Sequence, residues 1–246
     1  MKKKTYVWLL SLMLVMGCSK DSAISDDSDN ENAVGNDPDK EVPTTLNLSD
    51  GFKAVVVQPI IITNDDGVAS FYDIDIEKIN NTYSRAKVQF VWLKPKSVHN
   101  NAIYNGSMEL DQMKKWLTDN GHLTGENDIV NLVYTENLSG SSGPIGKAEM
   151  PGNTTFIAFD SNPGSILNVF VVCHEVGHNF GLLHADQDSN VPDDLPNVMG
   201  DGAYEDRLNP ENSFNDYQIG IINQAAILHS QEKTIELIEK YSLEVD

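Results

Sequence analysis

Three histidines with a fixed spacing are the residues of this sequence best suited to do chemistry. Residues 174–184 read HEVGHNFGLLH. Residues four apart on a helix project from one face, so the imidazoles of His174 and His178 can bind one metal ion together. Gly181 can adopt the left-handed conformation that ends a helix, and the chain can then bring His184 back as a third ligand. The spacing therefore predicts a metal site at the end of a helix.

The ligand set indicates the kind of metal site. Three neutral histidines leave Zn²⁺ its full charge and one coordination position for water, whereas structural zinc usually has four protein ligands. Glu175 lies about 100° around a helix from its neighbouring histidine, so we expect its carboxylate to face that water without binding the metal. The pattern is typical of a catalytic zinc site in which Glu175 is the general base.

These residues resemble the signature of the metzincin metallopeptidases, HExxHxxGxxH, at every fixed position. In that family a methionine turn follows and forms an apolar floor beneath the metal. Residues 196–200, PNVMG, resemble this turn, with Met199 as its methionine. The resemblance implies a zinc endopeptidase that hydrolyses peptide bonds through a zinc-bound water. Glu175 would take the proton from that water and pass it to the leaving amine.

The residues around the motif bear on the branch of the family. Residues 179–182, NFGL, look most like the adamalysin and reprolysin branch, but Ala185 stands where branches carry distinguishing residues. Astacins and serralysins have a tyrosine ligand two residues after the turn methionine. Asp201 occupies that position, so we predict no tyrosine ligand. Tyr204 is a weak candidate for a residue in the wall of the substrate cleft.

Hydrophobic periodicity predicts the elements that must position these residues. Apolar, β-branched runs predict strands at residues 54–62, 87–93, 129–135 and 154–159. Helical patterns occur at residues 74–83, at residues 107–118 with Ser107 as N-cap, and at the apolar residues 166–172 that lead into the motif. Alternating strands and helices indicate an α/β sheet with parallel neighbours.

The resemblance adds a more specific fold, a mixed α/β metzincin-like domain. It implies a twisted mixed sheet with an antiparallel edge strand, followed by the metal-binding helix, the methionine turn and a C-terminal helix. The edge strand would lie at residues 145–149, bounded by Ile145 and Glu149, and an extended protein or peptide substrate would pair with it. The last helix would run from about Asn215 toward Tyr241.

The N-terminal residues predict export and a lipid anchor. Lysines precede an apolar run at residues 6–16 that is too short to cross a bilayer as a helix. Residues 15–18, VMGC, resemble the lipobox of bacterial lipoproteins, which implies that Cys18 is acylated. We therefore expect residues 1–17 to be a signal peptide, with an ordinary signal containing a chance cysteine as the alternative.

The segment after Cys18 predicts a tether in the bacterial cell envelope. Residues 18–50 are rich in Ser, Asp and Asn, which favours a disordered acidic linker ahead of a catalytic domain at residues 51–246. Lipid on Cys18 would hold the protein at the outer membrane. Residues 18–21, CSKD, resemble tags that send lipoproteins to the cell surface, and a plain solvated linker is the alternative.

Charge and the remaining candidate residues limit the partners. The net charge of −20 disfavours nucleic acid, which needs clustered basic residues, and we expect a monomer. The acidic loops at residues 64–66 and 186–190 could bind Ca²⁺, with solvated loops as the stronger expectation. Three further histidines without partner spacing, and a cysteine expected to be a buried thiol, are not predicted ligands: His99, His122, His229 and Cys173.

Two other functions fit the motif. A non-catalytic surface module could hold zinc only to bind a partner, but it would have no need of Glu175. A zinc amidase could act on cell-wall peptides instead of proteins. Substrate tests must separate this amidase from an endopeptidase, because the loops that set a substrate pocket cannot be interpreted from sequence.

Overall fold

The computed structural model describes residues 46–70, 72, 74–124, 128–138, 145–159, 165–192, 195–200 and 203–242. The predicted signal peptide, Cys18, most of the predicted tether and Asp201 lie outside these residues. The described residues belong to one unit, Gly35–Asp246, as judged by their contacts. None of the helices in this part of the chain is long and apolar enough to span a bilayer.

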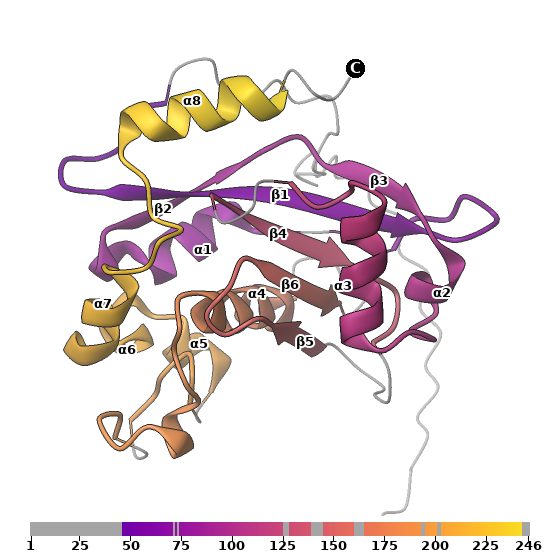
Figure 1. Ribbon diagram of the computed structural model, residues 1–246. Coiled ribbons are helices and arrows are strands. Elements are labelled where there is room, and N and C mark those ends of the chain that lie inside the picture. The colour runs from indigo at the N-terminus through magenta and orange to yellow at the C-terminus, as the bar shows by residue number, and fades with distance from the viewer. Residues whose placement is uncertain are drawn as a thin grey trace, which may run out of the picture. The chain divides into compact units, whose positions relative to one another are not determined.

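A twisted, mostly parallel sheet of six strands lies at the centre of the fold (Figure 1). Its main order is β2-β1-β4-β6-β5, and β3 pairs with β1. All pairs are parallel except β5 with β6, so the sheet ends in an antiparallel strand, as predicted. The strands are β1 (Lys53–Thr63), β2 (Val88–Trp92), β3 (Lys96–His99), β4 (Ile129–Tyr134), β5 (Ile145–Ala148) and β6 (Thr154–Ala158).

Strand β1 has two successive neighbours on one edge, and the sequence analysis missed the second, β3. Val57 pairs with β2, and Ile60 pairs with β3, while both residues pair with β4 on the opposite edge. Pro59 lies between them in the strand, and a proline has no N–H to donate to a neighbouring strand. The side chain of Gln58 bridges the gap by donating to the carbonyls of Pro59 (2.9 Å) and Lys94 (2.8 Å).

Helices cover both faces of the sheet, which explains why the strands read as continuous apolar runs. Val55 and Val57 of β1 pack toward α1 and α4, while Val56 and Ile60 face the opposite side, toward α8 and α3. The helices are α1 (Ile76–Thr82), α2 (Asn101–Tyr104), α3 (Leu110–Asp119), α4 (Ile166–Asn179), α5 (Tyr204–Arg207), α6 (Pro210–Ser213), α7 (Asp216–Ile222) and α8 (Gln231–Ser242), with 3₁₀ turns at η1 (Ser84–Ala86) and η2 (Ala185–Gln187).

The start of α3 differs from the prediction. Ser107 is not its N-cap, because the N–H of Ser107 donates to the carbonyl of Ala102 (2.9 Å) and closes the end of α2. Helix α3 begins three residues later, with Glu109 as N-cap. The side chain of Gln112 accepts from the N–H of Glu109 (3.2 Å), as in a capping box.

The predicted long C-terminal helix is two helices, α7 and α8. The residues between them leave the helical path because His229 forms an antiparallel bridge with Ala54 of β1. The two residues exchange both backbone hydrogen bonds at 2.9 Å. The chain therefore crosses the beginning of β1 before α8 packs on the sheet through Leu237 and Tyr241.

Candidate metal centre and active site

Helix α4 carries the first two histidines and ends in a way that its glycine allows. The Leu182 N–H donates to the Gly177 carbonyl (3.1 Å), and the Gly181 N–H donates to the His178 carbonyl (2.8 Å). These two bonds form a Schellman motif, in which Gly181 has the left-handed φ of 97°. The motif turns the chain sharply after α4, so that His184 returns toward the helix.

The three histidines converge on one point. The Nε2 atom of His184 lies 3.2 Å from that of His174 and 3.0 Å from that of His178. Nitrogen ligands at 2.0–2.1 Å in a tetrahedral zinc site are separated by about 3.3 Å. Among the described residues, these three form the one group of at least three metal-binding side chains. The donor set and its spacing therefore fit Zn²⁺.

Hydrogen bonds orient two of the rings for metal binding. Nδ1 of His174 lies 2.8 Å from the Val198 carbonyl, and Nδ1 of His178 lies 2.7 Å from the Leu182 carbonyl. A neutral ring that donates from Nδ1 leaves the Nε2 lone pair free for a metal. Burial lowers the pKa of His174 to about 4 and also lowers the pKa of His178. Both rings are therefore neutral at physiological pH, which is the form that binds metal.

Glu175 lies buried beside the cluster and touches the edge strand. The residue is 7% exposed, and burial raises the pKa of its carboxyl group to about 7 in the metal-free chain. Gly146 of β5 packs so closely that a Cβ there would lie 2.2 Å from Cγ of Glu175. The site thus brings together a carboxyl group suited to proton transfer and the backbone of the outermost strand.

Met199 lies against α4, where the resemblance places a methionine. Its sulfur would be 2.5 Å from a Cβ at Gly177, the helix residue just before His178. The Met199 carbonyl also accepts from the N–H of Ala185 (2.8 Å), directly after His184. The side chain is buried, so Met199 supports both the helix and the returning loop.

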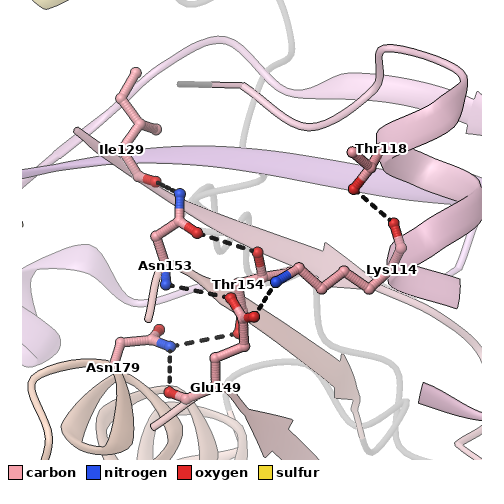
Figure 2. A network of polar contacts seen from close by, with 7 residues as sticks. All are labelled: Lys114, Thr118, Ile129, Glu149, Asn153, Thr154 and Asn179. Atoms are coloured by element: carbon pink, nitrogen blue, oxygen red, sulfur yellow. Dashed lines mark hydrogen bonds and ion pairs between the residues drawn. The ribbon is translucent and has the colours of Figure 1, made fainter. Parts of the chain in front are cut away.

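A polar network attaches the end of α4 to β5 and β6 (Figure 2). The side-chain NH₂ of Asn179 donates to the Glu149 carbonyl (3.0 Å), and its oxygen accepts from the Thr155 hydroxyl (2.7 Å). The Glu149 carboxylate in turn pairs with Lys114 of α3. Asn179 appeared in the sequence only as a marker of the reprolysin-like context. The structure shows that it joins the histidine-bearing helix to the residue that follows β5 and to β6.

The region around the methionine turn also contains Tyr204 and Arg207. The Tyr204 ring packs in a tilted arrangement on the Phe170 ring, with centroids 4.9 Å apart, and the Phe170 and His174 centroids are 5.6 Å apart. The Phe170 ring therefore lies between Tyr204 and the cluster of three histidines. Arg207 is buried and donates to backbone carbonyls of the turn, and no motif in the sequence marks it.

The other histidines and the cysteine considered in the sequence analysis lie outside the cluster of three histidines. His99 pairs with Asp65, His122 stacks on Trp116, and His229 binds the Asp128 carbonyl. As predicted, Cys173 is a buried thiol, and its pKa is raised to about 12 by burial.

The two acidic loops bond to their own residues. Asn64 accepts from the N–H groups of Asp66 and Val68, while Asp188 accepts from Asn190. Calcium binding there stays a prediction.

Comparisons with known proteins support part of this interpretation. Residues 73–185 match the family model described as metallo-peptidase family M12B, reprolysin-like. The match includes His174, Glu175, His178 and His184, and ends before Met199. No curated protein matches the chain. The family match and the histidine cluster together support a zinc metallopeptidase.

Solved structures that resemble this chain share little sequence identity with it. One is an archaemetzincin from Methanopyrus kandleri, with 17% identity and a TM-score of 0.38, covering 78% of this chain and 96% of that one. Another is described as a chaperone–substrate complex, with 14% identity and a TM-score of 0.41, covering 75% of this chain and 36% of that one.

Proposed function

We propose that this chain is a metzincin-type zinc endopeptidase in which Glu175 is the general base. One observation carries the proposal: three histidine Nε2 atoms converge beside a buried glutamate that contacts the outermost strand of the sheet. A structural metal site would not need an acid of raised pKa next to its ligands. The family match over residues 73–185 supports the same class.

His174, His178 and His184 would hold the metal. When bound, zinc supplies Lewis-acid chemistry by making water more acidic and by polarising a carbonyl group. Glu175 accepts a proton from the water whose oxygen attacks the scissile carbonyl carbon. As the C–N bond breaks, Glu175 returns the proton to the leaving nitrogen, and it is then ready for another cycle.

The substrate would be an extended protein or peptide that adds to the sheet at β5. Strand β5 pairs with β6 on one side and ends the strand order in the described part of the chain. Backbone groups on such an edge can pair with a peptide in β-augmentation. Because Gly146 touches Glu175, a peptide aligned along β5 passes its backbone close to the base.

The cellular setting is proposed from the sequence alone. Residues 15–18 support acylation at Cys18, and the acidic segment that follows supports a flexible tether. Lipid on Cys18 would hold the enzyme, which we expect to be a monomer, at the outer membrane, where it would meet proteins of the cell envelope or of the exterior. The net charge of −20 argues against a nucleic-acid partner.

Mass-spectrometric profiling of cleavage in a mixed library tests the proposal. The library should contain unstructured peptides, a folded protein and muropeptides, incubated with enzyme, with enzyme plus chelator, and with enzyme to which zinc is returned. We expect internal cleavage of peptides that the chelator abolishes and zinc restores. Cleavage of muropeptides alone would favour the amidase, and no cleavage of any substrate would favour the binding module.

A further inference from the structure

Arg207 is a buried arginine with no role in the motif that defines the site. It is the last residue of α5 and is 8% exposed. A buried guanidinium group is costly to remove from water unless protein groups accept its hydrogen bonds. The groups that accept them therefore indicate what the residue holds in place.

Two donors of Arg207 bind consecutive carbonyl groups of the methionine turn. Nε donates to the Asn197 carbonyl at 2.9 Å, and Nη2 donates to the Val198 carbonyl at 3.1 Å. The guanidinium is planar, with donors in a fixed fork, so it holds both carbonyls in one relative orientation. A flexible lysine side chain, with a single ammonium group, cannot impose that geometry.

The Val198 carbonyl links Arg207 to the metal cluster. This oxygen also lies 2.8 Å from Nδ1 of His174. A carbonyl oxygen has two lone pairs and can accept from both groups. Because the hydrogen bond at Nδ1 sets the tautomer and rotation of a ligand histidine, the group that fixes the acceptor also fixes the ring.

Arg207 also contacts a residue of α4, the helix that carries His174. The guanidinium carbon of Arg207 lies 3.9 Å from the centre of the Phe170 ring, in a cation–π arrangement. Phe170 precedes His174 by one helical turn, and the two ring centroids are 5.6 Å apart. Arg207 thus contacts both the turn that orients His174 and the aromatic ring that packs beside it.

We infer that Arg207 is a positioning residue for His174, holding the ring through the Val198 carbonyl in the orientation that binds zinc. The inference rests on the metal site of the proposed function, but not on peptide hydrolysis. Loss of such an outer partner typically weakens metal affinity by about 10–100-fold.

The experiment compares Arg207→Lys and Arg207→Met with the matched control Arg85→Lys. Arg85 also donates to a backbone carbonyl, that of Phe214 (2.8 Å), and pairs with Asp216, and both of these partners lie outside the turn at residues 196–200. The zinc dissociation constant is measured by competition with a chromophoric chelator. The visible absorption bands of the Co²⁺-substituted proteins report ligand geometry, which a loss of general stability would not alter.

The expected result is a dissociation constant about 10–100-fold higher in both Arg207 variants, with altered Co²⁺ bands. Arg85→Lys should stay within about threefold of wild type. Unchanged affinity and bands in the Arg207 variants would overturn the inference and leave the proposed function intact. Unfolding of both variants, with Arg85→Lys folded, would also overturn it, because Arg207 would then serve the fold in general.

Peptide hydrolysis separates the inference from the proposed function. If wild type binds zinc and the Arg207 variants bind it more weakly, the inference stands even when no peptide is cleaved. If wild type binds no zinc at all, both the inference and the proposed function fail.

Discussion

Replacement of Gly146 by alanine should damage catalysis without removing zinc. The added Cβ would lie 2.2 Å from Cγ and 2.6 Å from Cδ of Glu175. Carbon atoms in contact prefer separations of about 3.5–4.0 Å, so Cγ must move by at least about 1.3 Å and the carboxylate carbon by at least about 0.9 Å. Because Glu175 is almost fully buried, few alternative positions can receive its side chain.

The size of the effect follows from the sensitivity of catalysis to position. A misplacement of about 1 Å can cost on the order of 10²-fold in rate, which corresponds to about 2.7 kcal/mol in the activation barrier. We expect kcat to carry most of this loss, because alanine keeps the backbone groups of β5 that would pair with substrate. Zinc content should be unchanged, since Glu175 is not among the ligands.

The assay is steady-state hydrolysis of one fluorogenic peptide at matched zinc content. Gly220→Ala is the control, because Gly220 lies within α7 and a Cβ there has no neighbour within 4 Å. The control should keep wild-type rates. A kcat for Gly146→Ala within a few-fold of wild type would refute the reasoning. A rise in KM alone would also refute it, by showing that the strand moved and Glu175 did not.

Three further predictions concern the metal, the base and the N-terminus. His178→Ala should lose stoichiometric zinc and some thermal stability, while the exposed-site control His99→Ala should keep both, as checked by elemental analysis and thermal unfolding. In metal-free protein, burial raises the pKa of Glu175 from 4.5 to about 7, so the carboxylate destabilises the fold as pH rises through this window. In urea unfolding, Glu175→Gln should therefore be more stable than wild type by about 3 kcal/mol above pH 7, and the two proteins should be equally stable below pH 4.5. A difference in unfolding free energy that does not change with pH would contradict this prediction. Intact-mass analysis of membrane-associated protein should find an acylated N-terminal Cys18, and a Cys18→Ser variant should leave the membrane fraction.

Local patterns in the sequence were enough to predict the main elements around the site. The spacing of His174 and His178 follows from the helical period, and Gly181 supplies the positive φ that returns His184. Strands β1 and β4 were predictable because they are buried on both faces and therefore consist mostly of apolar residues.

Features that depend on contacts between separate segments of the chain were not predictable. Arg207 meets its acceptors only after α5 folds back on the methionine turn, and Asn179 meets Glu149 only when α4 docks beneath β5. The interruption between α7 and α8 has the same origin, because the bridge between His229 and Ala54 joins the two ends of the described domain. In each case the partner is a backbone group on a separate segment, at least nine residues away in sequence, and periodicity carries no information about it.

The most direct test of zinc-dependent peptide hydrolysis is the rate of Glu175→Gln relative to wild type. Glutamine keeps the shape and hydrogen-bonding capacity of the side chain but cannot accept the proton. With zinc content matched and a cleavable peptide from the library as substrate, turnover should fall by at least about 10²-fold, the lower range of general-base catalysis. Rates that agree within a few-fold would show that Glu175 is not the base and would contradict the proposed mechanism.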